Sequence, residues 1–482
     1  SRGLGDVYKR QEQYDLVILG GGTAGYVAGI RASQLGKKVA IVENQLLGGT
    51  CLHKGCIPTK ALLKSAEVLH TVKNAALYGV DTAQFQLNYE KVYERKDEIV
   101  AQMHTGVKHL MQHNHIDIYN GTGRILGSSI FSPQPGTISV EYADGNSELI
   151  PNDYVLIATG SRPAELPFLP FDHNVVLSSN GILKMTELPE SVAIIGGGVI
   201  GMEFASLLND FGTKVTVIEA GERILPNENK TVTKTLKKHL ENRGVSIYEN
   251  VQLSEENITI NEDSASIELE NESLTVDKIL LAVGRKPNTD DIGLNNTKIK
   301  LDEKGFIEVN EQQQTQEQHI YAAGDCIGKL QLAHAGSKEG TTAVEAMFDD
   351  TVIPVDYNAI PKCIYTYPEI ASIGMNIDQA KAADYKKARS FKVPFKAIGK
   401  AVIEDAEQQD GFCELVVDQE TDTVLGLSMI GPHVTELINE AALLQFMNGS
   451  TLELGLTTHA HPSLSEVLME AGLKAAQRSV HA

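Results

Sequence analysis

The sequence predicts an α/β chain in which two nucleotide-binding domains precede a C-terminal α+β domain. Segments 16–43 and 192–219 align without a gap at an offset of 176 residues. Each contains an apolar run, Gly-x-Gly-x-x-Gly, a helical stretch and a β-branched run that ends in glutamate. After Thr351 the pattern changes to runs that are typical of antiparallel strands. The repeat and this change of pattern define the predicted fold class.

The repeated glycine motif has a specific physical reason in each position. The first glycine makes the tight turn, the second lets the backbone approach a pyrophosphate, and the third lets helix and strand pack closely. The helix N-terminus favours the diphosphate, and the final acid accepts hydrogen bonds from a ribose. One such motif could be only a glycine-rich turn, but two complete copies predict two Rossmann-like domains that bind two dinucleotides. The residues are Gly20, Gly22, Gly25 and Glu43 in the first copy, and Gly196, Gly198, Gly201 and Glu219 in the second.

The acid of the second copy favours NAD over NADP. A carboxylate at Glu219 would repel a 2′-phosphate, and Ala220 and Gly221 provide no cation after it. The alternative is that Arg223 swings toward the ribose and accommodates the phosphate.

Three further strands mark the predicted domain boundaries. Segments 154–163 and 278–288 are buried-type strands closed by a glycine turn, and segment 319–326 is a strand that ends in Gly-Asp. Asp325 would lie in the ligand crevice and reach a polyhydroxyl chain, although it could be only a turn residue. We predict one nucleotide-binding domain over 14–160 and 286–350, another over 161–285, and a third domain over 351–482. Residues 1–13 are interpreted as a flexible tail or a remnant of cloning.

The C-terminal segment predicts strands and helices in an α+β arrangement. Runs 361–374 and 411–431 are expected to be antiparallel strands, with a turn at 419–423. Segment 435–449 is expected to be an amphipathic helix that stops at Gly449.

Composition bounds the environment and the partners. The chain has 482 residues, a net charge of −21 and 42 % hydrophobic residues, which predicts folded cores and disfavours nucleic acid and anionic membranes. The sequence contains no run of 18 apolar residues, so we predict no transmembrane helix. The N-terminus lacks the apolar core of a secretory signal. Five cysteines do not form a disulfide framework. A reducing cytoplasm is therefore expected.

Two of these cysteines, Cys51 and Cys56, lie in the sequence GGTCLHKGCIPTK, residues 48–60. On one regular helix their Cα atoms would be roughly 8–9 Å apart, beyond the ~7 Å limit for a disulfide. Either the pair never bonds or the backbone bends between them, and Gly55 and Pro58 are the residues that would allow a bend. Two thiols are too few for a zinc site. A structural pair remains possible, but the position beside the first glycine turn favours a redox pair.

A second chemical constellation lies near the C-terminus. His459 and His461 flank Ala460, and a histidine is a natural proton acceptor for a thiol at neutral pH, although a single loop histidine more often has no catalytic function. Ser463 and Glu466 have the spacing of a helix capping box. Glu466 could both cap the helix and orient an imidazole.

Taken in order, these motifs resemble those of the flavin disulfide reductases. The resemblance extends from about Tyr14 to the end, and within the family it is greatest to the branch that oxidises dihydrolipoamide. One departure is the pair His53-Lys54 between the cysteines, where Asn-Val is commoner. The resemblance implies a homodimer with a C-terminal dimerisation domain, FAD and NAD as cofactors, and no metal.

The resemblance also implies site residues. Catalysis would use Cys51, Cys56, His461 and Glu466. FAD would be held by Gly20, Gly22, Thr23, Ala24, Gly25, Glu43, Gly49, Thr50, Lys60, Gly123, Thr159, Gly160, Asp325, Leu332, Ala333 and His334. NAD would be held by Gly196, Gly198, Val199, Ile200, Gly201, Glu203, Glu219, Val251 and Gly284, and Lys60 would pair with Glu203.

The implied reaction is oxidation of a reduced lipoyl group carried on a partner protein. That partner would be the acyltransferase core of a 2-oxoacid dehydrogenase complex or the H protein of glycine cleavage. The substrate would attack Cys51, Cys56 would leave as a thiolate, and His461 of the other subunit would take the proton. Two alternatives stay open: a related reductase acting on another disulfide or thiol, such as glutathione or coenzyme A, and a non-catalytic flavoprotein that only docks in an assembly.

Overall fold

The computed structural model describes residues 13–128, 136–349, 351–404 and 410–481. These residues form two compact units, which are described one at a time. The first unit comprises residues 1–61, 91–164 and 285–355, and the second comprises 62–90, 165–284 and 356–482. The tail predicted over 1–13 lies outside the described residues except for Gln13.

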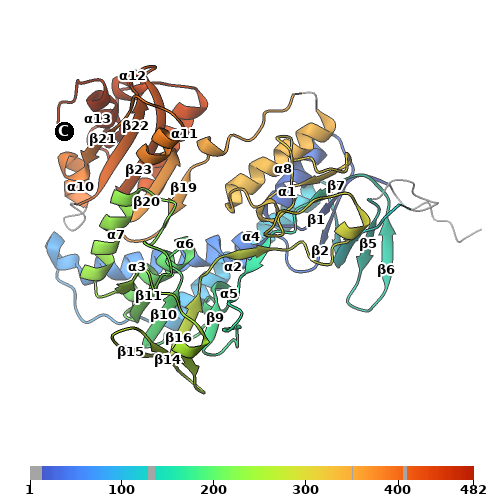
Figure 1. Cartoon of the computed structure of the whole chain (residues 1–482), viewed down its shortest axis with the longest axis horizontal. Helices are drawn as coiled ribbons and strands as arrows, with labels where there is room; N and C mark the ends of the chain where they lie inside the picture. Colours follow the sequence, from blue (N-terminus) through green and yellow to red (C-terminus); the bar gives the residue numbers. More distant parts are fainter. Residues whose placement is uncertain (1–12, 129–135, 350, 405–409, 482) are drawn as a thin grey trace, which may run out of the picture. The chain divides into compact units, whose positions relative to one another are not determined.

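The first unit is built on a five-stranded parallel sheet (Figure 1). Its order is β18-β7-β1-β2-β3, so the first strand of the glycine motif lies at the centre. Leu16 is paired with Val39 on one side and with Tyr154 on the other. The strands are β1 (Tyr14–Leu19), β2 (Val39–Glu43), β3 (Asp117–Asn120), β7 (Asn152–Ile157) and β18 (Ile320–Ala322).

Alternating side chains of β1 pack into two different cores. Leu16 and Ile18 pack with α1 (Thr23–Gln34), α4 (Tyr89–His113) and α8 (Ala333–Phe348). Val17 and Leu19 pack with the antiparallel sheet β4 (Thr122–Ile125), β5 (Ile138–Glu141) and β6 (Ser147–Ile150). The continuous apolar run of β1 is thus explained by burial on both faces.

The second unit repeats the strand–helix–strand motif. The parallel sheet has the order β12-β11-β10-β16-β9, and the motif runs through β10 (Ser191–Ile195), α6 (Val199–Phe211) and β11 (Lys214–Ile218). The prediction of two Rossmann-like units is confirmed. The remaining elements are β9 (Val176–Ser178), β12 (Ser246–Tyr248), β16 (Lys278–Leu281), α7 (Lys230–Asn242) and the antiparallel strands β13 (Ile258–Ile260), β14 (Ala265–Glu268) and β15 (Ser273–Val276).

The C-terminal part of this unit is the predicted α+β region. Five antiparallel strands in the order β19-β20-β23-β22-β21 pack against helices α11 and α13. The predicted turn joins β22 to β23, and the predicted helix ends at Phe446, shortly before Gly449. The elements are β19 (Lys362–Ile364), β20 (Glu369–Gly374), β21 (Ala388–Pro394), β22 (Phe412–Asp418), β23 (Thr423–Gly431), α11 (Val434–Phe446), α12 (Thr451–Leu456) and α13 (Glu466–Ala475), with α5 (Ser179–Ile182), α9 (Ile377–Ala382) and α10 (Gly399–Glu404) in the connections of the unit.

The two boundary segments contain the predicted strands closed by glycine turns, and each continues into a second short strand that was not predicted. β7 ends at Ile157 and the chain resumes as β8 (Ser161–Pro163), while β16 is followed by β17 (Arg285–Pro287). Gly160 at φ +70° and Gly284 at φ +115° turn the backbone between the pieces. β8 and β17 then pair antiparallel in a ribbon of their own.

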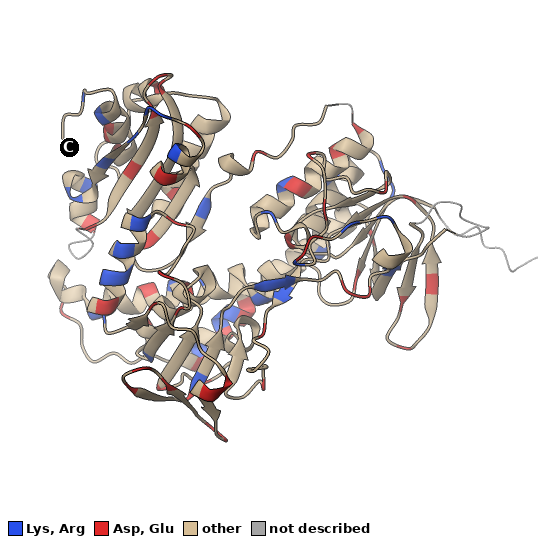
Figure 2. Cartoon of the chain, in the orientation of Figure 1, with Lys and Arg blue, Asp and Glu red and all other residues tan. Residues whose placement is uncertain are grey.

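Lysines along α7 are visible as a basic stripe in Figure 2. Three of them have acidic partners within the second unit. Lys230 lies 3.3 Å from Asp378, Lys237 lies 2.6 Å from Glu249, and Lys238 lies 2.8 Å from Asp410.

Within the described ranges, no helix combines the length and the apolar character that crossing a bilayer requires.

Candidate redox and dinucleotide sites

The two central cysteines lie on either side of a break in the helix. Helix α2 spans Gly49–Lys54 and α3 spans Cys56–Lys73, and Gly55 between them has φ −149° and ψ −109°. The predicted bend is confirmed and is located at Gly55. Pro58 does not make it, because it lies in the first turn of α3, where a missing N–H costs no helical hydrogen bond.

The electrostatic surroundings of the cysteines include two cations. A hydrogen bond with Cys56 and burial raise the pKa of the Cys51 thiol, and the charge of Lys60 opposes them. Burial lowers the pKa of Arg285, while Asp325 and Cys56 act in the opposite direction. Lys60 thus favours the thiolate of Cys51 against two larger effects that favour its thiol, and Arg285 and a thiolate at Cys56 would stabilise each other.

The first glycine turn has the close contacts that the motif predicts. A Cβ on Gly20, which has φ +104°, would lie 2.3 Å from the oxygen of Ala158, and one on Gly25 would lie 1.9 Å from the oxygen of Gly20. Helix α1 begins at Thr23 without a side-chain cap or an acid in its first turn. Its first N–H groups are thus available for an anionic group.

Glu43, the last residue of β2, is hydrogen-bonded to this turn. Glu43 Oε2 accepts a hydrogen bond from the N–H of Gly21 at 2.7 Å, and Oε1 accepts one from Gln45 at 2.7 Å. Each carboxylate oxygen retains a further lone pair for a ribose hydroxyl. These contacts fit the diphosphate and ribose of FAD.

The second turn repeats this geometry. Glu219 accepts from the N–H of Gly197 and from that of Gly221, both at 2.6 Å, and a Cβ on Gly201 would lie 2.0 Å from the oxygen of Gly196. A Cβ on Gly198 would meet no atom within 4 Å. An open approach at the second glycine is what a bound pyrophosphate of NAD requires.

The alternative role of Arg223 at a 2′-phosphate is not supported by its contacts. Its guanidinium donates to the oxygens of Leu225, at 3.2 Å, and Glu228, at 2.9 Å. It also donates to the hydroxyl of Thr233 at 3.1 Å and to the oxygen of Pro226. These bonds hold the side chain in its own loop, so Glu219 remains the residue predicted to bind the ribose.

Asp325 has partners that the sequence did not indicate. The hydroxyl of Ser161 donates to Asp325 Oδ2 at 2.5 Å, and Nε of Arg285 lies 3.8 Å from the same oxygen. The N–H of Gly324 donates to the fully buried Glu339 at 2.7 Å. This strand end is therefore held by a network of charged and polar groups.

Two other glycines predicted for the first cofactor pack against this turn and its strands. A Cβ on Gly49 would lie 2.6 Å from the Cα of Gly22, and one on Gly123 would lie 2.5 Å from Leu19. Gly336, in the first turn of α8, lies against Gly324 and Ala24. Of the other predicted residues, Leu332 caps the N-terminus of α8, and Ala333 and His334 are its first two residues.

The sequence did not identify the residues that support these positions. Asn288 donates from its backbone to Gly160 and from its side chain to the oxygen of Thr159, both at 2.9 Å. Gly21 and Gly197 supply the N–H groups for the two acids. Their signal was present, because both motifs read Gly-Gly-Gly at their start.

The two C-terminal histidines have different roles in the structure. His459 has a 4 % exposed side chain and is hydrogen-bonded to Glu440 at 2.7 Å and to the oxygen of Thr457 at 2.8 Å. His461 is 77 % exposed, and its Nδ1 lies 2.9 Å from Glu466 Oε1. Since a carboxylate accepts, Nδ1 carries the hydrogen and Nε2 is the outward basic nitrogen.

Glu466 combines the two tasks suggested for it. Its other oxygen accepts from the N–H of Ser463 at 2.9 Å, and this bond, followed by that with His461, lowers the pKa of the carboxyl group. The reciprocal half of the capping box is absent, because the Ser463 hydroxyl pairs with that of Ser465 at 2.9 Å and α13 begins only at Glu466.

The remaining predicted residues lie in the second unit, except Lys60. Glu203 is buried and accepts from the N–H of Tyr365 at 3.0 Å, so its pairing with Lys60 stays a prediction. Val251 donates its N–H to the oxygen of Glu219 at 3.0 Å. Val199 is exposed at the start of α6, and a Cβ on Gly284 would meet nothing within 4 Å.

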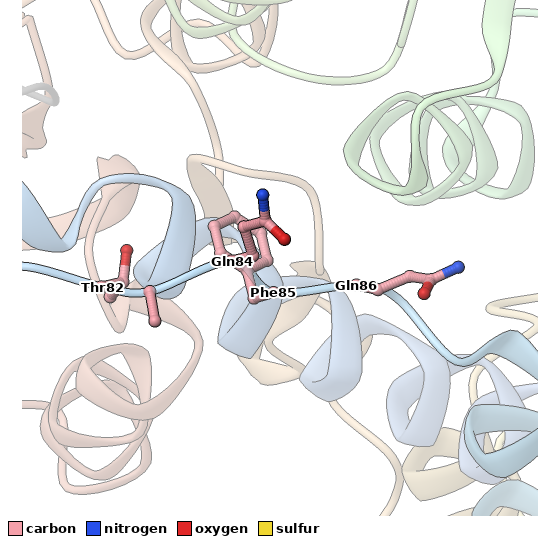
Figure 3. A pocket seen from close by; sticks show the side chains of 5 residues that line it. Thr82, Gln84, Phe85 and Gln86 are labelled. Carbon is pink, nitrogen blue, oxygen red and sulfur yellow. The ribbon is translucent and has the colours of Figure 1, made fainter.

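One pocket is lined by a segment that contains none of the predicted site residues. It is lined by residues 82–86, an extended segment before α4, and Figure 3 shows Thr82, Gln84, Phe85 and Gln86 around it. None of the lining residues is ionisable, so this pocket offers no acid–base or redox chemistry.

Comparison with known proteins identifies the family. Residues 14–340 match the pyridine nucleotide-disulphide oxidoreductase family, and residues 360–472 match its dimerisation domain. The chain is 51 % identical to a dihydrolipoyl dehydrogenase of Bacillus subtilis, over 97 % of this chain and 99 % of the relative, and 36 % identical to that of Geobacillus stearothermophilus, over 97 % of each.

Solved structures agree with this assignment. LpdA from Mycobacterium tuberculosis superposes with a TM-score of 0.88 at 25 % identity, over 95 % of this chain and 99 % of that one. The HOCl-induced flavoprotein disulfide reductase RclA from Escherichia coli gives 0.82 at 27 % identity, over 95 % and 99 %. With two glycine turns, a bent cysteine pair and a matching C-terminal domain, this chain belongs to the pyridine nucleotide-disulphide oxidoreductase family.

Proposed function

We propose that this enzyme is a dihydrolipoyl dehydrogenase, which oxidises protein-bound dihydrolipoamide to lipoamide and reduces NAD. The single observation that carries the proposal is the position of Cys51 and Cys56 on either side of the break at Gly55, in the segment that follows the first glycine turn. Relatives that share nearly the whole chain bear this name. The proposal keeps FAD at the first turn and NAD at the second.

The protein's own groups would carry the thiol chemistry. In the oxidised enzyme Cys51 and Cys56 form a disulfide, and a dihydrolipoyl thiolate attacks the sulfur of Cys51. The Cys51–Cys56 bond breaks and Cys56 leaves as a thiolate, which the charge of Arg285 favours. The second dihydrolipoyl thiol then attacks the mixed disulfide, releases lipoamide and leaves both enzyme sulfurs reduced.

His461 would move the proton. Its Nε2 accepts the proton of the substrate thiol, while Glu466 holds Nδ1–H and stabilises the imidazolium. FAD, when bound, supplies the two-electron carrier that links the dithiol to hydride transfer onto NAD. The resemblance to the flavin disulfide reductases implies that this histidine comes from the other subunit of a homodimer, and we adopt that assignment. The match to a dimerisation domain supports a dimer.

The proposed partners are lipoyl domains of an acyltransferase core or the H protein of glycine cleavage, in the cytoplasm. The proposed boundaries are 14–160 with 286–350 for the flavin domain, 161–285 for the NAD domain and 351–482 for the dimerisation domain. The family matches at 14–340 and 360–472 are compatible with the last boundary.

A substrate series tests the assignment. Dihydrolipoamide with NAD should turn over rapidly, whereas glutathione disulfide or coenzyme A disulfide with NADPH should not. Cys51→Ser should abolish dihydrolipoamide oxidation and retain bound flavin, and Cys363→Ser serves as the matched control with unchanged turnover. Silence with dihydrolipoamide and good turnover of another disulfide would instead identify a related reductase.

A further inference from the structure

Two histidines in the first unit are hydrogen-bonded to one backbone carbonyl. His53 Nε2 lies 2.9 Å from the oxygen of Leu47, and His104 Nδ1 lies 3.0 Å from the same oxygen. The two rings are 5.1 Å apart between centroids and inclined by 66°. His53 comes from α2, between the two cysteines, and His104 comes from α4.

This geometry assigns a tautomer to each ring. A carbonyl oxygen only accepts hydrogen bonds, and it has two lone pairs. Both facing nitrogens must therefore carry hydrogen: Nε2 in His53 and Nδ1 in His104. The two side chains present their N–H groups from different ring positions, and this difference can be tested.

The shared carbonyl lies at a junction between the first glycine turn and the cysteine helix. Leu47 precedes Gly48 and Gly49, which have φ +107° and φ +62° and lead into α2. The N–H of Gly48 donates to the oxygen of Gly21 at 2.8 Å, and Gly49 packs directly on Gly22. Fixing the carbonyl of Leu47 therefore fixes the start of the helix that carries Cys51.

The surroundings of His53 lower the pKa of its imidazole. Burial is the largest cause that lowers the pKa of His53, and the charges of His104 and Lys54 act in the same direction. The carbonyl of Leu47 and the charge of Glu43 oppose them. Both rings are bonded to the same carbonyl of the turn, so the contribution that we assign to them is positional.

We propose that His53 and His104 form a positioning pair that fixes the Leu47 turn, and thereby sets the orientation of Cys51 for its reaction. This role rests on the proposed function of Cys51. It assigns a purpose to the histidine at position 53, between the two cysteines. We regard both histidines as positioning residues, because the contact that they share is with the turn.

Amide side chains provide a crossed test of the two tautomers. The Nδ2 of asparagine occupies nearly the position of histidine Nδ1, and the Nε2 of glutamine occupies that of histidine Nε2. His104→Asn and His53→Gln should therefore retain the donor. The exchanged variants, His104→Gln and His53→Asn, should lose it at similar size and polarity. His109→Asn, an exposed histidine on the same helix, is the control.

The first measurement is the rate at which iodoacetamide alkylates Cys51 in the reduced holoenzyme, followed by mass spectrometry of the modified peptide. His104→Gln and His53→Asn should each change this rate by about three- to tenfold, as expected for one lost protein hydrogen bond. His104→Asn, His53→Gln and the control should stay within about twofold of the parent. Equal rates for the matched and exchanged variants would overturn the positioning role.

The second measurement does not require activity. Histidines labelled with 13C and 15N should show Nε2–H for His53 and Nδ1–H for His104, with each signal assigned by its loss in the variants. The same tautomer at both rings would refute the shared carbonyl. Because this readout is independent of turnover, a failed substrate assay would overturn the proposed function alone.

Discussion

The third glycine of the NAD turn allows a prediction whose size follows from the structure. In Gly201→Ala the new methyl carbon would lie 2.0 Å from the oxygen of Gly196, whereas a relaxed carbon–oxygen contact is well above 3 Å. The oxygen belongs to the backbone, so relief requires α6 to move away from β10 by about 1 Å. Overpacking of this kind costs about 1–3 kcal/mol or more, which corresponds to a fall in melting temperature of roughly 2–12 °C for a domain of this size.

Gly198→Ala is the matched comparison. Its Cβ would meet no protein atom within 4 Å, and its φ of −75° suits alanine. The folded protein should keep its melting temperature within about 2 °C, since the substitution introduces no strain. The methyl would, however, occupy the approach of the pyrophosphate, so the KM for NAD should rise by at least about tenfold.

The assays are differential scanning calorimetry of the holoenzyme and steady-state kinetics with dihydrolipoamide and NAD. The flavin absorbance of both variants should match the parent, because the first glycine turn is untouched. Gly198→Ala with an unchanged KM for NAD would refute the placement of the pyrophosphate. An unchanged melting temperature in Gly201→Ala would refute the packing argument.

The remaining predictions concern ionisable groups. His461→Gln should lower kcat for dihydrolipoamide oxidation by about 10²- to 10⁴-fold and spare NADH oxidation by a quinone. His459→Gln, at a buried site with two hydrogen bonds, should mainly lower the melting temperature. The reverse pattern would contradict the assignment. Burial raises the pKa of Cys326 to about 12, so iodoacetamide at pH 8 should leave this thiol unmodified in the native enzyme, as peptide mass spectrometry can check. The folded pKa of His53 lies below its usual 6.5, so its contribution to stability is complete above that pH and is lost as pH falls below it; urea midpoints from pH 5 to 8 should show this loss, and His53→Gln should reduce it. Glu219→Gln should raise the KM for NAD by about tenfold without creating activity with NADP, because it adds no cation.

The sequence was most informative where a physical requirement has few chemical solutions. The two glycine turns require residues without a Cβ, because a Cβ on Gly25 or Gly201 would lie 1.9 Å or 2.0 Å from a backbone oxygen of the same turn. The acids at 43 and 219 were found because a ribose-binding carboxylate follows its strand at a fixed distance. The bend near Gly55 followed from helix geometry and the reach of a disulfide.

The supporting contacts were not predictable in the same way. Ser161, Arg285 and Asn288 are far from Asp325 and Thr159 along the chain, and only the folded ribbon of β8 and β17 brings them near. Three residues are also too few to show a periodicity, which is why β8 and β17 were not predicted after their glycine turns. The two C-terminal histidines looked equivalent until burial separated them.

The close packing of α8 on α1 sets an order for biosynthesis. Gly340 would place a Cβ only 2.5 Å from the oxygen of Ala24, and β18 forms an edge of the sheet that begins with β1. Roughly 300 residues separate these partners, so a ribosome needs about 15–60 s between them. The intervening segment can fold as it emerges. The core that β1 and α1 share with α8 stays incomplete until α8 has been synthesised. Chaperones that shield nascent β1 and α1 during this interval should therefore raise the yield of active enzyme.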